Sequence, residues 1–252
     1  MWAGQRSGDQ GAQAPISDYQ ACARAFASPH YYPAMEQQEK QAEPRALKYH
    51  EAWQRLWHAW AIANPEPTLL PTLVQRYCEP HRHYHTLQHL DACFAHLASV
   101  RDQAAQPAEI ELALWFHDAM YGIGAQDNEL KSADWASASL QAAGVDADVA
   151  RRVHALVMVT CHTALPQTPD EAILIDVDLA ILGAPEPHFD AYERQVRAEY
   201  ASVPLDQFRA RRRRILQQFL ERERIYHTAY FNARCEAQAR ANLRRSIARL
   251  AD

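Results

Sequence analysis

The pair His117-Asp118 is the first feature of the sequence that could do chemistry, because it interrupts an apolar stretch. When residues 108–121 are projected onto a helix at about 100° per residue, His117 falls near the middle of the apolar arc and Asp118 at its edge. A charge without a partner is costly in a protein core. A bound cation would remove that cost, since it pairs with the carboxylate and bonds to a ring nitrogen. The pair therefore predicts a metal site, with a hydrogen-bonded core histidine as the alternative.

Two other segments offer side chains that could complete such a site. His85 and His89 are four residues apart, so they share one face if the segment is helical. When Leu174 is taken as the centre of a buried arc, Asp178 lies about 40° from it and Asp176 about 200° away. This projection predicts that Asp178 is the buried carboxylate, whereas Asp176 is a surface residue or supports the ligands.

The predicted metal ligands are two imidazoles and two carboxylates: His89, His117, Asp118 and Asp178. Mixed nitrogen and oxygen donors suit Mn, Fe, Co, Ni, Zn or Mg and leave positions open for water. The set is too rich in oxygen for a closed structural zinc site. A bound cation lowers the pKa of water and makes it a nucleophile near neutral pH. His85 could then protonate a leaving oxygen as a general acid.

The order of these residues resembles the HD-domain superfamily of metal-dependent phosphohydrolases, which has a histidine, an adjacent His-Asp pair and a distal aspartate on helices. Tyr84-His85-x-x-x-His89 is similar to the signature of cyclic-nucleotide phosphodiesterases, and this likeness implies that His85 is the general acid and His89 a metal ligand. Over about residues 46–250 the chain resembles a bacterial group of small, predicted HD phosphohydrolases of unassigned substrate. The shared features are Arg82-His83-Tyr84-His85, Phe116-His117-Asp118, Asn128-Glu129-x-x-Ser132-Ala133, Asp176-x-Asp178-Leu179-Ala180-Ile181-Leu182-Gly183 and Val196-Arg197-x-Glu199-Tyr200. The resemblance implies an α-helical HD fold and phosphoester hydrolysis, and it does not imply a substrate.

Three more residues are candidates for supporting roles at the metal site. Glu129 could orient the nucleophilic water or a ligand histidine, or it could only interact with the dipole of the helix that it opens. His154 and His162 are eight residues apart on one predicted helix. Some HD proteins use extra histidines to hold a second metal, so both residues are candidates for a second metal or for support of the first.

The candidates for substrate binding are Arg82, Asn128 and Arg197. Arg197 could bind a substrate phosphate or form a buried ion pair with an acidic neighbour. The expected substrate is a small phosphorylated compound such as a nucleotide, because a net charge of −5 does not favour binding to nucleic acid. The alternatives are a di-iron oxygenase of HD type and a nucleotide-binding sensor without catalysis.

The elements that must position these residues are predicted to be helices. Glycine is scarce, at 7 of 252 residues, while Ala, Leu, Glu, Gln and Arg are plentiful. We expect an all-α bundle of roughly ten helices in one domain, residues 45–252. Residues 1–44 are predicted to be a low-complexity, disordered leader, with a short helix at 19–26 and Met35 as an alternative start. The expected helices cover residues 47–64, 68–78, 84–102, 107 to about 121, 128–143, 146–162, 171–182, 187–201, 205–223 and 230–250.

The remaining composition predicts a cytoplasmic protein. The five cysteines are odd in number and have no CxxC spacing, which favours reduced thiols over a disulfide framework. No apolar run reaches about 18 residues, so no membrane span is expected. The first residues lack the apolar segment of a secretory signal.

Overall fold

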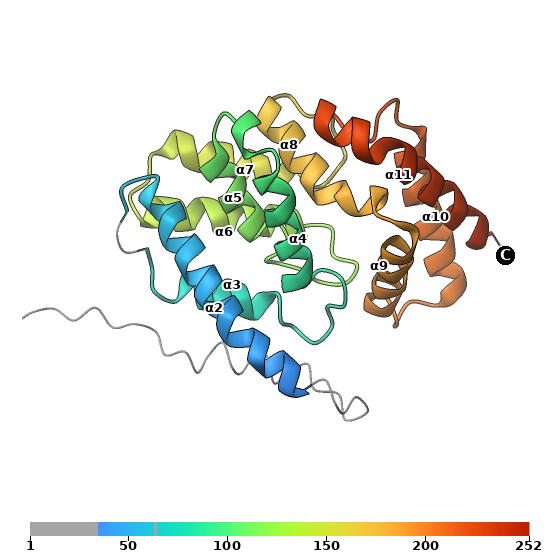
Figure 1. Cartoon of the computed structure of the whole chain (residues 1–252), viewed down its shortest axis with the longest axis horizontal. Coiled ribbons are helices and arrows are strands. Elements are labelled where there is room, and N and C mark those ends of the chain that lie inside the picture. The colour runs from blue at the N-terminus through green and yellow to red at the C-terminus, as the bar shows by residue number, and fades with distance from the viewer. Residues whose placement is uncertain (1–34, 63–64, 252) are drawn as a thin grey trace, which may run out of the picture.

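The computed structural model describes residues 35–62 and 65–251, and every regular element in these residues is a helix (Figure 1). The prediction of an all-α bundle is thereby confirmed. The elements are α2 (Met35–His58), α3 (Leu69–Arg76), α4 (Leu87–Ala98), η1 (Arg101–Gln103), α5 (Pro107–Phe116), α6 (Asn128–Ala142), α7 (Ala147–Val159), α8 (Pro169–Asp178), η2 (Leu179–Gly183), α9 (Glu186–Glu199), α10 (Leu205–Glu221) and α11 (Ala229–Arg249), where η marks a 3₁₀ helix.

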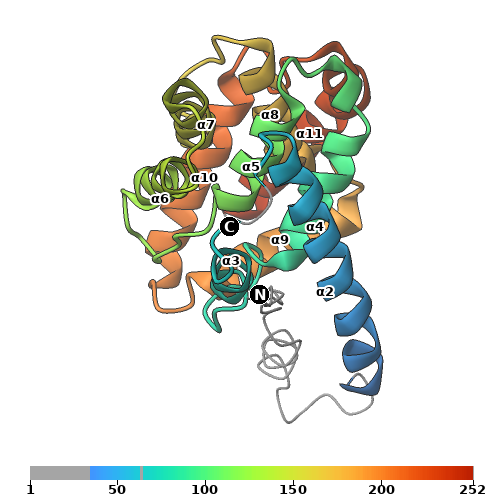
Figure 2. The same cartoon turned by 90° about the vertical axis from the view of Figure 1, so that its left-hand side faces the viewer.

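Helix α5 lies at the centre of the bundle and contacts α2, α4, α6, α7 and α8 (Figures 1 and 2). Its sequence is mostly apolar, with Glu109 and Glu111 as the charged exceptions, and Ile110, Leu114 and Phe116 are fully buried. A helix with this composition is stable only when it is surrounded by other helices. The buried carboxylate of Glu109 is paired with Arg152 of α7 at 2.6 and 2.9 Å. The end of α5 therefore delivers His117 into the interior.

The histidines of interest lie at helix ends, not within helices as the sequence predicted. Helix α4 begins at Leu87 because Thr86 caps it, with its hydroxyl accepting a hydrogen bond from the Gln88 amide at 3.3 Å. His85 therefore lies in the preceding turn. Helix α5 ends at Phe116, so His117 is its C-cap and Asp118 follows in a turn. Helix α7 ends at Val159, which places His162 beyond it.

Asp176 is fully buried, so the prediction that it faces solvent is wrong. Its carboxylate accepts hydrogen bonds from the His227 amide at 2.8 Å and from the amide and hydroxyl of Thr228, both at 2.7 Å. The helical projection failed because residues 227 and 228, which precede α11, cover the side of α8 that was assigned to solvent, while Asp178, predicted to be the buried carboxylate, is only partly buried. Asp176 thus fastens the beginning of α11 to α8.

Two further predictions concern the amino-terminal segment and the cysteines. Helix α2 begins at Met35, so the last ten residues of the predicted leader 1–44 are helical, and the expected helix at 19–26 lies outside the described residues. Cys93, Cys161 and Cys235 are free thiols, as expected. Cys78 is disulfide-bonded, so the expectation of reduced thiols fails there. Within the described residues, no helix is long and apolar enough to cross a membrane.

Candidate metal centre

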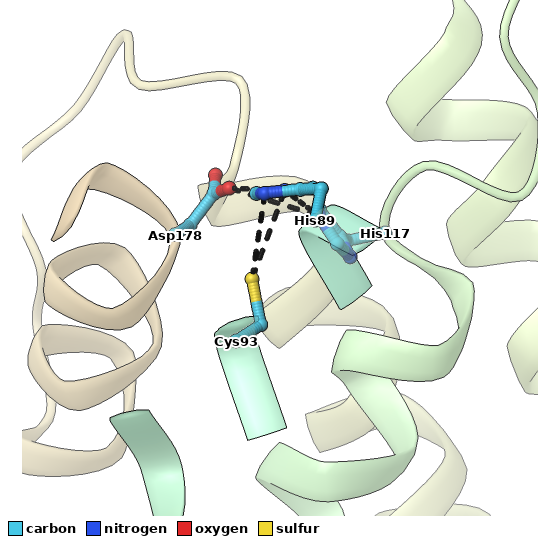
Figure 3. Close-up of side chains that lie close together, drawn as sticks. All are labelled: His89, Cys93, His117 and Asp178. Carbon is cyan, nitrogen blue, oxygen red and sulfur yellow. Dashed lines mark hydrogen bonds and ion pairs between the residues drawn. The ribbon is translucent and has the colours of Figure 1, made fainter. Parts of the chain in front are cut away.

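Three helix ends bring four predicted ligands together (Figure 3 shows three of them, with Cys93). His89 lies in the first turn of α4, His117 caps α5, Asp118 follows it, and Asp178 is the last residue of α8. The two Nε2 atoms of the histidines are 3.1 Å apart. Asp178 Oδ1 lies 3.2 Å from His89 Nε2 and 3.6 Å from His117 Nε2. Asp118 Oδ2 lies 3.5 Å and 3.0 Å from the same two atoms.

These separations fit donors that share one cation. Atoms bound to one ion at about 2.1 Å lie roughly 3.0 Å apart at right angles and roughly 3.4 Å apart in a tetrahedron. His117 Nδ1 donates a hydrogen bond to the Leu114 carbonyl at 2.8 Å, so in the neutral ring Nε2 carries the lone pair. The other three donors lie 3.0 to 3.6 Å from this atom. The chemistry and spacing of the set therefore suit a divalent cation.

The electrostatics of the cluster are those of buried imidazoles beside partly buried carboxylates. Burial alone would lower the pKa of His117, but the charge and hydrogen bond of Asp118 raise it to about 9. Burial alone would raise the pKa of Asp118, but His117 and His85 hold it well below its usual range. For Asp178, hydrogen bonds from His162 and His89 likewise outweigh burial and lower the pKa. A cation that binds here must displace the proton held by His117.

His85 lies beside this cluster and is held by Glu199 of α9. Its Nδ1 is 2.7 Å from Glu199 Oε2, and the side chain of Glu199 is fully buried. Burial alone would raise the pKa of Glu199, but hydrogen bonds from His85 lower it to about 2. The carboxylate therefore only accepts, so Nδ1 donates and Nε2 is the nitrogen left to exchange a proton. Although burial would lower the pKa of His85, the charges of Asp118 and Glu199 raise it.

The same carboxylate fixes the turn that carries His85. Glu199 Oε1 accepts hydrogen bonds from the amides of His83, Tyr84 and His85 at 2.8, 2.8 and 3.0 Å. Glu199 Oε2 also accepts from the hydroxyl of Tyr121 at 2.9 Å. One buried carboxylate thus sets both the backbone and the ring of His85.

Arg82 joins the His85 turn to the turn after α5. The side chain is buried, with Nη1 donating to the carbonyls of His85 at 3.2 Å and Asp118 at 2.6 Å. Its Nη2 donates to the Ala119 carbonyl at 3.1 Å, and its Nε to Glu79 at 3.0 Å. These internal contacts occupy the guanidinium, so Arg82 positions the site. It has no free group for a substrate, and the prediction that it binds substrate is not supported.

We expect Arg82→Lys to lower the free energy of unfolding by about 3 kcal/mol, because an ammonium cannot replace a buried guanidinium that holds three carbonyls. Urea denaturation measures the change. Arg76→Lys is the matched control, since Arg76 pairs with the same Glu79 at 3.1 Å but is only half-buried, and it should cost less than about 1 kcal/mol. Equal losses in the two variants would contradict the assigned role of Arg82.

His162 also reaches the cluster, although it does not lie on α7. Its Nε2 is 2.9 Å from Asp178 Oδ2, the oxygen that faces away from His89 and His117. Its buried Nδ1 has no hydrogen-bond partner among the described residues. The backbone adopts a φ of +54°, which is uncommon for a residue other than glycine, and its carbonyl accepts a hydrogen bond from Arg222. His162 is thus held against Asp178 by an unusual backbone conformation.

The other candidates are engaged elsewhere. His154 pairs with Asp134 at 3.0 Å across α6 and α7, so it does not join His162. The amide of Asn128 bonds to both the N–H and the carbonyl of Gly122 and closes the loop before α6. These contacts do not place His154 or Asn128 at the cluster.

Arg197 and Glu129 also differ from the expected arrangement. Arg197 donates to the carbonyls of Tyr200 and Val203 at the end of α9 and stacks on Phe208, and it makes no buried ion pair among the described residues. Glu129 is half-buried in the first turn of α6. Burial raises the pKa of Cys161, and the charge of Glu129 raises it further. Glu129 therefore lies near the segment that ends in His162.

Two residues of the site were missed from the sequence. Glu199 was noted only as part of a motif, and nothing in its local pattern reveals that it crosses to the His85 turn. Cys93 lies one helical turn after His89, and its Sγ is 3.7 Å from His89 Nε2 (Figure 3). The spacing His89-x-x-x-Cys93 was a signal that could have identified it. Burial and the charges of Asp178 and Asp118 raise the pKa of this thiol well above its usual value.

Comparison with known proteins does not identify this arrangement. No protein-family model, no curated protein and no solved structure matches the chain.

Proposed function

We propose that this chain is a metal-dependent phosphohydrolase of the HD type, acting on a small phosphorylated compound such as a nucleotide. The observation that supports it is the convergence of His89, His117, Asp118 and Asp178, with neighbouring donor atoms 3.0 to 3.6 Å apart. His85 beside the cluster adds a proton donor, which a site that only binds a metal would not need.

In this proposal the residues have distinct roles. The cation held by the four ligands would supply Lewis-acid activation of the phosphoryl group and of water. Protonated His85 donates the proton of Nε2 to the leaving oxygen, while Nδ1–H stays on Glu199. Arg82 keeps the two turns that carry His85 and Asp118 in register.

A panel of phosphoesters tests the proposal. The purified protein is assayed with nucleoside monophosphates, cyclic nucleotides and simple phosphomonoesters in the presence of Mn²⁺, Ni²⁺, Co²⁺ or Mg²⁺. We expect phosphate release from at least one compound, and a loss of at least about 100-fold in kcat/KM in Asp118→Ala, because a ligand is removed. Asp134→Ala, which removes an exposed carboxylate on α6, should keep full activity.

Two outcomes would contradict hydrolysis. If tight nucleotide binding occurs without turnover under any metal, the chain is a sensor. If Asp118→Ala and Asp134→Ala release phosphate at equal rates, the activity does not arise at this centre.

A di-iron oxygenase is a second candidate, and one observation favours it. Asp178 directs Oδ1 towards His89 and His117 and Oδ2 towards His162. A carboxylate with histidines on both oxygens could join two metal ions. Two irons per chain and oxygen consumption, without phosphate release, would identify this chemistry.

A further inference from the structure

We propose that Cys93 is a further ligand of the metal centre and makes it selective for a thiophilic cation such as Zn²⁺ or Fe²⁺ over Mg²⁺. This inference rests on the metal centre of the proposed function and adds the class of metal to it.

The geometry brings the sulfur within reach of the shared position. Sγ of Cys93 and donor atoms of His89, His117 and Asp178 all lie within 4.8 Å of one another (Figure 3). The sulfur is 3.7 Å from His89 Nε2. Donors on one tetrahedral ion, with a metal–sulfur bond of about 2.3 Å and a metal–nitrogen bond of about 2.1 Å, lie roughly 3.6 Å apart. The distance from Sγ to Nε2 is close to this value, but Sγ also lies 3.8 Å from His89 Nδ1, so the Cys93 side chain must turn towards the ion for the sulfur to bond to it.

The position of Cys93 is set by the helix and the core. His89 and Cys93 lie one turn apart on the same face of α4, so any ion that bonds to the first is presented to the second. The exposed fractions of Cys93, His117 and His89 are 1%, 2% and 6%. The sulfur is therefore shielded from solvent, and with Cys93 the centre would offer one sulfur, two imidazoles and two carboxylates.

The chemistry of the set distinguishes metals. Mg²⁺ prefers oxygen ligands and keeps several waters, whereas a thiolate with two imidazoles suits Zn²⁺, Fe²⁺ or Co²⁺. When the ion binds, a sulfur–metal bond forms, the S–H bond breaks, and the proton passes to solvent. No electron is transferred, so the step needs no oxidant.

The competing arrangement is a neutral thiol packed on the imidazole. Sγ is nearly equidistant from the two ring nitrogens of His89, at 3.8 Å from Nδ1 and 3.7 Å from Nε2. A sulfur in this contact could stabilise the ring without bonding to an ion. The two arrangements differ in whether a cobalt–sulfur bond exists, which absorption spectroscopy detects.

The test uses Co²⁺ as the probe on the full chain stripped of metal. Variant Cys161→Ser/Cys235→Ser leaves Cys93 as the one free thiol among the described residues. We expect it to show visible ligand-field bands together with a sulfur-to-cobalt charge-transfer band in the near ultraviolet. Cys93→Ser should keep the ligand-field bands and lose the charge-transfer band. Titration calorimetry should show at least about a tenfold loss of Zn²⁺ affinity in Cys93→Ser, with Mg²⁺ affinity unchanged.

The contrary outcomes separate this inference from the proposed function. Ligand-field bands without a charge-transfer band in the Cys161→Ser/Cys235→Ser variant would overturn the role of Cys93 and leave the metal centre intact. No cobalt uptake by this variant or by the unaltered chain would overturn both. The first spectrum does not depend on whether Cys93→Ser folds, so the inference is tested in either case.

Discussion

Replacing Asp178 with asparagine is expected to remove the divalent cation from the purified protein and to abolish phosphate release. Asp178 has one oxygen near His89 and His117 and the other on His162, so its charge balances three imidazoles. An amide keeps the size and removes the charge. We expect metal affinity to fall at least about 100-fold, measured by calorimetry with Zn²⁺ or Mn²⁺, and kcat/KM to fall in parallel.

Asp176→Asn is the matched control, because Asp176 lies two residues earlier on α8 and is more deeply buried than Asp178. Its carboxylate holds the amides of His227 and Thr228 at the start of α11. We expect this variant to lose roughly 1–3 kcal/mol of unfolding free energy and to keep its metal. If instead Asp176→Asn lost the metal and Asp178→Asn retained it, the assignment of the distal ligand would be reversed.

Glu199→Gln is expected to slow hydrolysis on the order of 100-fold while the cation stays bound, because Glu199 orients His85 without contacting the metal ligands. Glu199 also helps to raise the pKa of His85. A proton donor must be protonated to act, so the alkaline limb of the kcat profile should move to lower pH in the variant. A full pH profile of kcat measures the shift.

The interaction between Glu199 and His85 should also affect the free energy of unfolding at acidic pH. The pKa of Glu199 is about 2 in the folded chain and 4.5 as its ordinary value. A lowered carboxyl pKa contributes stability above pH 4.5, and this contribution is lost as the pH falls from 4.5 towards 2. Glu199→Gln should therefore flatten the loss of unfolding free energy in that window, measured with urea at a series of pH values.

Tyr121→Phe is the control for this variant, since it removes one hydrogen bond to Glu199 Oε2 and leaves the charge in place. It should cost about 1 kcal/mol and leave the alkaline limb of kcat near its original position. If Tyr121→Phe moved the limb as far as Glu199→Gln, the shift would not report on the charge of Glu199.

The sequence predicted the all-α architecture and the four residues that converge, because both depend on helical periodicity and residue type. The apolar composition of α5 correctly identified a buried helix, whereas the projection of α8 was wrong, because Asp176 is fully buried and Asp178 is only partly buried. That the four side chains bind a cation stays a prediction. The helical pattern in the sequence was weakest at the helix ends. For that reason His85 was predicted on α4, which begins after it, and His162 on α7, which ends before it.

The parts that could not be predicted depend on tertiary packing between distant segments. Asp176 was assigned to solvent because a projection of one helix does not contain the distant segment, residues 227 and 228, that covers it. Glu199 reaches back to the His85 turn from α9, and no local pattern encodes that contact. Arg82 and Arg197 looked available to a substrate, since a guanidinium offers five donors, yet backbone carbonyls occupy both.

The placement of the four candidate ligands at the ends of three helices has a consequence for folding. No single helix or adjacent helix pair contains the whole set, so the binding position exists only after α4, α5 and α8 have docked. A cation with affinity for the native state alone would stabilise the entire domain by mass action. Local opening where α4, α5 or α8 meets the other two helices would release the cation. Ion binding would therefore measure how cooperatively the whole bundle folds.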